Sequence, residues 1–162
     1  MTVVEGTVEI RAYKEEDAPA IVRLFYETVR SVNLSDYSQE QVEAWAPEVP
    51  DESAWNRRMA GRKTLVAEEN GEVVGFAELE EDGHLDMFYV RKDAVGRGVG
   101  LWLYRAIEAE ARALLRAGRI FTEASITARP FFEHQGFRVV REQTVSRRGV
   151  GLTNFVMEKP LD

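Results

Sequence analysis

The segment LDMFYVRKDAVGRGVGLWLYRAIEAEA, Leu85–Ala111, joins an apolar run to a long amphipathic stretch through glycines at alternate positions, Gly96, Gly98 and Gly100. The apolar run alternates like a strand, and the stretch after the glycines has helical spacing. Glycine has no Cβ and the first turn of a helix leaves its N–H groups unpaired, so a ligand can approach the bare backbone. Arg97 adds a positive charge within the loop. The segment therefore predicts a site for a phosphate or pyrophosphate.

The glycine spacing does not match the common nucleotide-binding loops. A Walker loop would place Lys and Ser or Thr after its last glycine, but Leu101 and Trp102 follow here. A dinucleotide-binding loop reads G-x-G-x-x-G after the first strand of a βαβ unit, whereas this loop reads G-x-G-x-G after an antiparallel run. A loop that only turns a corner remains an alternative, although one or two glycines suffice for a turn.

Periodicity and turn residues predict the remaining elements. Strands are expected over 7–13, 63–69, 72–80, 84–90, 119–125, 137–147 and 151–159. Helices are expected from the cap Asp17 to about Val32, from the cap Ser38 to Pro47, over about 52–61, from Val99 to Gly118, and over 127–135. The helix between strands 84–90 and 119–125 implies a parallel pair in a mostly antiparallel sheet. We expect one α+β domain over residues 1–162.

Composition and charge narrow the functional classes. The net charge of −7 argues against a nucleic-acid partner, with a local basic patch at Arg147 and Arg148 as the alternative. With no cysteine and only two histidines, a thiol nucleophile, a disulfide framework and a metal site are not expected. The N-terminus lacks the pattern of a signal peptide, and no apolar run approaches the ~20 residues of a membrane span. We therefore expect a cytoplasmic protein without a membrane partner.

The segment MFYVRKDAVGRGVGLWLYRAIEAEAR resembles the acyl-CoA-binding motif of the GNAT superfamily of N-acetyltransferases. Two further segments are similar to family segments: VEIRAYKEEDAPAI to the first strand and helix, and SITARPFFEHQGF to a late motif. The order of elements also fits. The resemblance implies a GNAT-like fold whose parallel strands splay apart at the CoA site. It also implies transfer of an acetyl group from acetyl-CoA to an amine by direct attack in a ternary complex.

The resemblance further implies which residues bind acetyl-CoA. Backbone groups of Phe88–Val90 should pair with the pantetheine arm, the N–H groups of Gly96–Leu101 should hold the pyrophosphate, and the late motif should line the far wall. The expected cofactor-binding residues are Phe88, Tyr89, Val90, Val95, Gly96, Arg97, Gly98, Val99, Gly100, Leu101, Ser125, Ala128, Phe131 and Phe132.

Three positions depart from the family pattern. Val95 stands where the family has Gln or Arg, and Ser125 and Phe132 stand where the late motif has Asn and Tyr. In the family that Tyr usually protonates the departing thiolate. A thiol titrates near pH 8–9, so a thiolate can leave without a dedicated acid. These departures keep two alternatives open: a CoA-binding or ligand-sensing module with little or no catalysis, and an interaction module with a vestigial loop.

The strand before the glycine loop carries two candidate catalytic residues, His84 and Asp86. Strict alternation would place both on the face of Phe88 and Val90, about 7 Å apart. His84 falls where several members of the family carry a catalytic Glu or His, and imidazole titrates near neutrality. It would act as general base or water relay, and Asp86 would assist it or bind a cationic amine. Alternatively, His84 is a solvated strand end, with Glu78 and Glu80 as reserve candidates.

The resemblance places the acceptor between the first helices and the final hairpin. We expect a small-molecule or peptide amine, and the acidic composition hints at a cationic one. Trp45 could form a pocket wall or fill the core. The hairpin could also form a homodimer surface. Residues that these segments offer to the acceptor side are Phe25, Tyr26, Arg30, Tyr37, Trp45, Trp55, Asn154 and Phe155.

Overall fold

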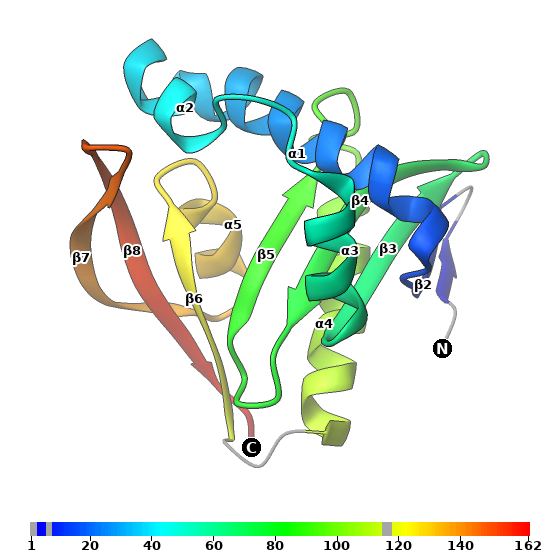
Figure 1. The fold of residues 1–162 in the computed structure, drawn as a ribbon. Helices are drawn as coiled ribbons and strands as arrows, with labels where there is room; N and C mark the ends of the chain where they lie inside the picture. Colours follow the sequence, from blue (N-terminus) through cyan, green and yellow to red (C-terminus); the bar gives the residue numbers. More distant parts are fainter. Residues whose placement is uncertain (1–2, 6–7, 115–117) are drawn as a thin grey trace.

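A computed structural model describes residues 3–5, 8–114 and 118–162, and it shows two twisted sheets side by side (Figure 1). The first sheet is antiparallel with the order β1-β2-β3-β4-β5, and the second has the order β6-β8-β7. The strands are β1 Val3–Glu5, β2 Val8–Ala12, β3 Lys63–Glu69, β4 Glu72–Leu79, β5 Leu85–Val90, β6 Arg119–Ser125, β7 Arg138–Arg147 and β8 Val150–Pro160. The helices are α1 Ala18–Ser31, α2 Gln39–Trp45, α3 Glu52–Ala60, α4 Val99–Leu114 and α5 Arg129–His134, with 3-10 turns at Glu15–Asp17 and Asn33–Ser35.

The α+β fold class and the order of the predicted elements are confirmed, with one strand added. Sequence periodicity did not predict β1, which pairs with β2 at the edge of the first sheet. The predicted strand 7–13 begins in the structure at Val8, and residue 7 lies outside the described residues. The structure describes helix α4 as far as Leu114. The predicted end of this helix, just before Gly118, falls on residues 115–117, which lie outside the described residues.

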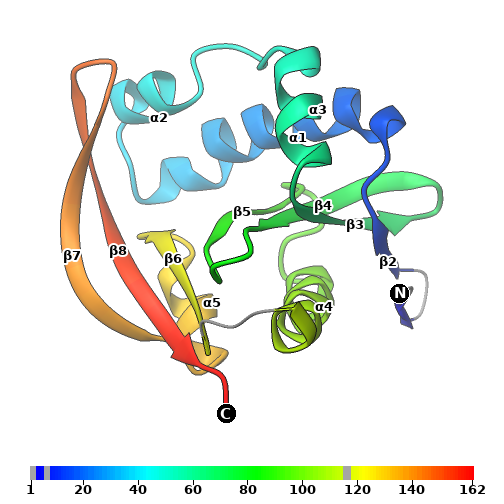
Figure 2. The same cartoon turned by 60° about the horizontal axis from the view of Figure 1, so that its bottom comes forward.

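Helices cover both faces of the five-stranded sheet (Figure 2). Helix α4 lies against one face, where Leu103 and Ile107 are fully buried beside strand residues. Helices α1 and α3 lie against the other face, where Ile21 and Met59 pack with Phe76 of β4. Each face therefore has its own apolar core. Within the described residues, no helix has the length and apolar character needed to span a membrane.

The two sheets meet along β5 and β6, which run parallel and separate toward their C-terminal ends (Figure 1). Within the described residues, a single isolated bridge, between His84 and Phe121, joins them. Next to it, the hydroxyl of Thr122 donates to the carbonyl of Leu85 at 2.8 Å. Because pairing stops there, the C-terminal part of β5 keeps an open edge. The two parallel strands splay apart as expected, and their pairing is limited to this one bridge.

The two predicted helix caps differ in outcome. Ser38 accepts a hydrogen bond from the N–H of Gln41, and the Gln41 side chain accepts one from the N–H of Ser38, so the predicted capping box is confirmed. Asp17 precedes α1 but makes no side-chain cap. Its carboxylate instead accepts from the N–H of Lys14 at 2.9 Å and pairs with Arg11. Because the Asp17 carboxylate is engaged by Arg11 and Lys14, it does not accept from the N–H groups of the α1 terminus.

Candidate active site

A β-bulge in β5 changes which side chains share a face. Glu78 lies opposite Met87, but the next residue of β4, Leu79, lies opposite Leu85, so Asp86 is an extra residue. Leu85 therefore packs in the same core as Phe88 and Val90, on the α4 side. The expectation from strict alternation, with Asp86 on the face of Phe88 and Val90, is wrong. The bulge turns Asp86 toward the opposite side of the sheet.

The open edge of β5 offers unpaired backbone groups. The N–H of Arg91 donates to β4, whereas the carbonyl of Val90 accepts from the hydroxyl of Thr28 in α1 at 3.0 Å. Alternate residues of a strand direct their backbone groups to the same edge. Phe88 therefore directs its N–H and carbonyl away from β4, toward the gap between β5 and β6. An extended chain of amides could add to this edge as a further strand does.

The glycine loop ends at the N-terminus of α4 with its N–H groups free. Gly96 and Gly98 both have φ of +84°, in the left-handed region, and an added Cβ on either would meet no atom within 4 Å. The carbonyl of Gly98 accepts from Trp102, which starts the helix. Among the described residues, no acceptor is recorded for the N–H groups of Gly98, Val99, Gly100 and Leu101. Four converging donors at a helix N-terminus form an anion site.

A groove of about 360 Å³ lies between the glycine loop and β6, and we call it the glycine groove. Its walls come from α1, β5, the glycine loop and the segment from β6 to α5. Phe131 closes one side and fits closely because Gly100 has no side chain: a Cβ there would lie 3.4 Å from the Phe131 ring. The lining residues are Thr28, Val32, Asn33, Phe88, Tyr89, Val90, Val95, Gly96, Gly98, Gly100, Leu101, Ser125, Thr127, Ala128 and Phe131.

The groove gathers most of the residues expected to bind acetyl-CoA, but Arg97, Val99 and Phe132 do not line it. Arg97 is exposed and pairs with Glu69 at 2.6 Å. Val99 is 1% exposed, in the core beneath the loop. The ring of Phe132 is 2% exposed and packs against Phe88, Tyr104 and Phe137. The expectation that Phe132 lines the groove wall thus differs from the structure, because the apolar ring turns into the core.

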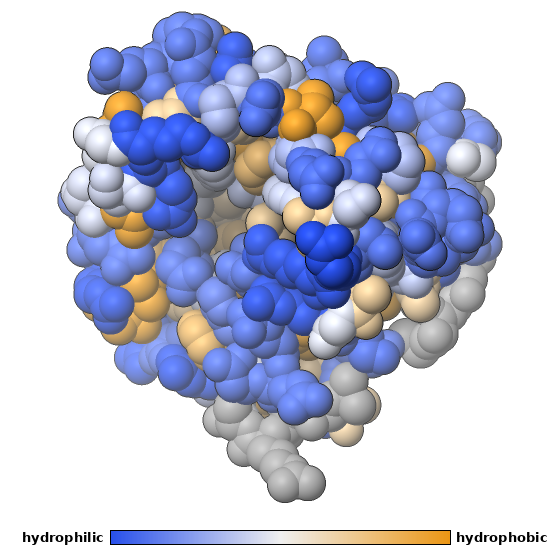
Figure 3. Space-filling model, viewed as in Figure 1, coloured by the Kyte–Doolittle hydropathy of each residue, from blue (hydrophilic) through white to orange (hydrophobic). Residues whose placement is uncertain are grey.

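A second cavity of about 460 Å³ lies on the other side of the splayed strands, and we call it the hairpin pocket. Figure 3 shows this face hollowed between the tip of the β7–β8 hairpin and α3, with hydrophilic side chains on the rim. The lining residues are Phe25, Tyr37, Trp45, Arg58, Asp86, Met87, Tyr89, Glu123, Ser125, Val145, Arg147, Arg148, Leu152, Thr153 and Asn154. Tyr89 and Ser125 line both cavities, so the two cavities meet there.

Half of the residues expected on the acceptor side line this pocket. Phe25, Tyr37, Trp45 and Asn154 do so. The side chains that do not line it are Tyr26, Arg30, Trp55 and Phe155. Tyr37 holds the pocket together, because its hydroxyl donates to the carbonyl of Thr153 at 2.6 Å and accepts from the N–H of Ile126 at 2.9 Å. Burial raises the pKa of Tyr37, so the hydroxyl keeps its proton.

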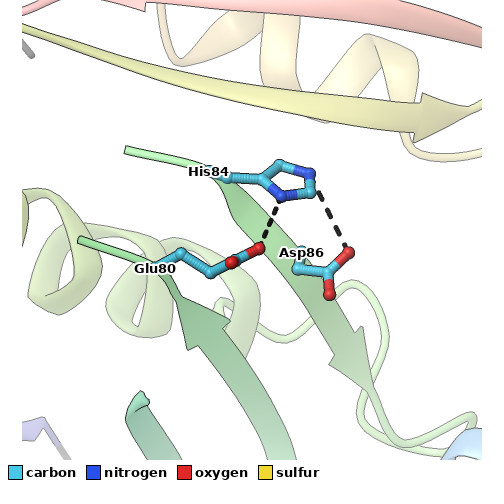
Figure 4. Close-up of side chains that lie close together, drawn as sticks. All are labelled: Glu80, His84 and Asp86. Atoms are coloured by element: carbon cyan, nitrogen blue, oxygen red, sulfur yellow. Dashed lines mark hydrogen bonds and ion pairs between the residues drawn. The ribbon is translucent and has the colours of Figure 1, made fainter. Parts of the chain in front are cut away.

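His84 is enclosed by carboxylates. Its Nδ1 lies 2.7 Å from Glu80, its Nε2 lies 2.7 Å from Glu123, and Asp86 is 3.8 Å from Nε2. Figure 4 shows the imidazole between Glu80 and Asp86. The hydrogen bond to Glu123, together with that to Glu80, raises the pKa of His84 to about 9, against the opposing effect of burial. The ring is therefore protonated at neutral pH, which does not favour the expected role of general base.

Asp86 belongs to a network of charges at the floor of the hairpin pocket. Arg58 of α3 donates to Asp86 and to Glu78, which is 1% exposed. Arg62 also donates to both carboxylates. Two arginines thus compensate the buried Glu78 and fix Asp86. The sequence showed the carboxylates but not these partners: Arg58 in α3 and Arg62 just after it lie 20 and 16 residues before Glu78 along the chain.

Glu123 is a site residue that the sequence analysis missed. It lies on β6 two residues before Ser125, lines the hairpin pocket, and accepts from His84 across the gap between the sheets. The alternation of β6 places Glu123 and Ser125 on one side, next to the junction of the cavities. In the sequence RIFTEAS, a charged residue within an otherwise half-apolar strand was the available signal.

The comparisons with known proteins agree on one family. A model of the acetyltransferase (GNAT) domain matches residues 33–159. Over 152 residues the chain is 34% identical to the uncharacterized N-acetyltransferase YafP of Escherichia coli strain K12, covering 94% of this chain and 95% of YafP. The chain therefore belongs to the GNAT superfamily of N-acetyltransferases and is an acetyltransferase, as its motifs indicated.

Solved structures show the same fold. A GCN5-related N-acetyltransferase from Rhodopseudomonas palustris matches with a TM-score of 0.90 and 39% identity, covering 98% of this chain and 99% of that one. The yncA protein of Salmonella typhimurium, solved with its cofactor acetyl-CoA, matches with a TM-score of 0.74 and 22% identity, over 97% of this chain and 95% of that one. At that identity the second likeness concerns the fold alone.

Proposed function

We propose that the protein transfers an acetyl group from acetyl-CoA, bound in the glycine groove, to an amine bound in the hairpin pocket. The meeting of the two cavities at Tyr89 and Ser125 carries this proposal. Direct transfer requires both reactants to lie in contact, and a shared opening between two separate cavities permits that contact. No covalent intermediate on the protein is needed.

The residues of the glycine groove fit acetyl-CoA. Free N–H groups from Gly98 to Leu101 suit a pyrophosphate, and the left-handed Gly96 and Gly98 leave open space above the loop. The open edge of β5 at Phe88 suits the amides of a pantetheine arm. When bound, acetyl-CoA supplies an activated acyl thioester. The relative yncA was solved with this cofactor, which supports the same assignment here.

Residues of the two cavities would stabilise the negative charge of the reaction, bind the ammonium group and accept its proton. The N–H of Phe88 faces the gap and would donate to an oxygen that gains negative charge. Glu123 and Asp86 line the hairpin pocket as carboxylates, and they would hold the ammonium group and receive its proton, directly or through water. His84 would act as a positioning residue, because it fixes Glu123 at 2.7 Å.

Ser125 would replace part of the role that the family gives to Tyr in the late motif. Its Oγ accepts from the N–H of Ala128 at 3.0 Å and from Asn33 at 3.4 Å, so its own proton remains available. The hydroxyl lies where the cavities meet and would donate to the departing sulfur. Phe132 cannot take this part, because its buried ring has no proton to give.

A second candidate function is a CoA-binding or ligand-sensing module with little catalysis. The buried Phe132, in the place of the usual acid, favours it. Both candidates predict binding in the glycine groove, but only the first predicts turnover with an amine.

Calorimetry with the purified protein separates these candidates from a loop that binds no cofactor. We expect micromolar binding of acetyl-CoA and of desulfo-CoA, and much weaker binding of ATP, which lacks the pantetheine arm. A panel of amines with acetyl-CoA is then followed by release of free thiol. Turnover identifies the enzyme, binding without turnover of any amine favours the sensing module, and absence of binding overturns both.

A further inference from the structure

The two ends of the hairpin pocket differ in charge. At its floor, Asp86 and Glu123 belong to a network in which every cation, Arg58, Arg62 and the protonated His84, contacts carboxylates. The tip of the β7–β8 hairpin (Figure 1) contributes two arginines to the rim of the pocket, Arg147 and Arg148. Among the described residues neither has a carboxylate partner. The rim is therefore positive, although the whole chain carries −7.

Arg147 lines the pocket and has no recorded ion pair among the described residues. Within the described part of the chain, its side chain makes one recorded hydrogen bond, to the carbonyl of the adjacent Ser146 at 3.1 Å. Burial raises the pKa of Tyr89, a residue of the pocket wall, and the positive charge of Arg147 acts against this rise. A guanidinium that faces a cavity, unpaired, is suited to binding an anion.

Arg148 is held in an uncommon conformation. Its φ of +51° lies in the left-handed region, where the first residue of such a two-residue turn is ordinarily Asn, Asp or Gly. An arginine there is strained, and strained residues gather at ligand-binding sites. Its Nη1 donates to the carbonyl of Ala44 in α2 at 2.7 Å, and no acceptor is recorded for its other nitrogens among the described residues. That contact also ties the hairpin tip to the wall of the pocket.

A third feature points to a ligand with hydrogen-bond donors. The Oδ1 of Asn154, on β8 in the wall of the pocket, is buried and has no hydrogen-bond partner within the described part of the chain. A buried acceptor without a partner destabilises the folded protein until a donor reaches it. An ammonium group between Asn154 and the carboxylates of Glu123 and Asp86 would supply that donor.

We propose that the acceptor carries a carboxylate beside its amine, and that Arg147 and Arg148 bind the carboxylate while Glu123, Asp86 and Asn154 hold the amine. This assignment rests on the proposed function and names the class of its acceptor: an amino acid or related zwitterion. The acidic total charge of the chain alone had hinted at a purely cationic amine, but the local charge of the pocket differs from that total. Apolar lining by Phe25, Trp45, Met87, Val145 and Leu152 selects an apolar or aromatic body.

A binding experiment without acetyl-CoA tests the rim directly. The probes are 3-phenylpropionate, which carries the carboxylate but no amine, and 3-phenylpropanol, its neutral analogue. Binding is followed by calorimetry and by the fluorescence of Trp45, which lines the pocket. The variants are Arg147→Gln, Arg147→Lys and, as a matched control, Arg141→Gln, which changes an arginine of β7 outside the pocket.

We expect 3-phenylpropionate to bind at least 10-fold more tightly than the alcohol, as a charged hydrogen-bonded pair provides. Arg147→Gln should remove most of this preference, Arg147→Lys should restore part of it, and Arg141→Gln should keep it. Equal binding of the two probes, binding of neither, or an equal loss in Arg141→Gln would overturn the assignment. Since no probe is acetylated, these results do not depend on whether acetyl-CoA binds, which calorimetry of the cofactor decides separately.

Discussion

The Nε2 atom of His84 and the Oε1 atom of Glu123 lie 2.7 Å apart, across the gap between the two sheets. The other ring nitrogen lies at the same distance from Glu80, the residue after β4, and the ring stacks on Phe121 of β6. One protonated imidazole thus links carboxylates of both sheets, next to the only bridge recorded between β5 and β6 in the described residues. Beyond this point the strands separate and the two cavities meet.

The link between the sheets should make stability depend on pH. The carboxylates raise the pKa of His84 from 6.5 to about 9. A raised pKa in the folded state means that the stabilisation is fully present below pH 6.5 and is lost as pH rises through about 9. With the partners partly exposed, we expect about 2 kcal/mol. Urea unfolding of the wild type and of His84→Gln should show this difference at pH 6 and little difference at pH 10.

His134→Gln serves as the matched control, because that histidine has no recorded charged partner among the described residues. Its unfolding free energy should follow the wild type across the same range. A constant difference between His84→Gln and the wild type from pH 6 to pH 10 would contradict the protonated link.

The sequence predicted the elements and the glycine loop because both depend on local patterns. The spacing of apolar residues and the cap residue Ser38 can each be recognised from a few neighbouring positions. The faces of β5 could not be read in this way. A bulge inserts one residue at Asp86, beside the buried Glu78 that pairs with Arg58 and Arg62, and such contacts between distant segments leave no periodic trace.

The candidate site was predictable on the cofactor side and much less so on the acceptor side. Residues of the glycine groove lie mostly in two short segments that match family motifs. The hairpin pocket draws on β5, β6, α2, α3 and the final hairpin, so no single segment describes it. Arg147 stands in β7 with three other charged residues, and only the fold distinguishes a charge that faces a cavity from one that faces solvent.

Gly98→Glu should abolish acetyl-CoA binding at a modest cost in stability. The carboxylate would occupy the open space above the free N–H groups of α4 and repel a pyrophosphate. The left-handed φ of +84° makes any side chain there strained by about 1–2 kcal/mol. Calorimetry should show no binding of acetyl-CoA, and urea unfolding should show the strain.

Gly71→Glu provides the control for backbone strain. Gly71 has φ of +82°, an added Cβ would also meet no atom within 4 Å, and it lies in the β3–β4 turn outside the groove. It should lose similar stability and keep its affinity for acetyl-CoA. Equal affinity in both variants would show that the pyrophosphate does not bind at the glycine loop.

Ser125→Ala should lower kcat by about 10-fold to 100-fold with little change in the KM for acetyl-CoA, because a hydrogen bond formed only as sulfur departs acts on the rate. The variant also loses the bond from the N–H of Ala128, which should cost about 1 kcal/mol of stability. Ser125→Thr keeps the hydroxyl and should recover most of the rate. Equal rates for Ser125→Ala and Ser125→Thr, measured by thiol release, would remove the hydroxyl from the reaction.

Glu123→Gln separates the removal of the amine proton from the arrangement of the site. The amide keeps the size of the side chain and a hydrogen bond to His84, but it cannot accept a proton or balance an ammonium group. We expect kcat/KM for the amine to fall by about 100-fold, within the range of general acid–base catalysis. The pKa of His84 should fall as well, since its hydrogen bond to Glu123 is the largest cause of the rise.

Glu142→Gln, on β7 outside the pocket, is the control and should change neither value. If the pKa of His84 falls while the rate at saturating amine is unchanged, Glu123 only joins the sheets, and Asp86 becomes the carboxylate to test next.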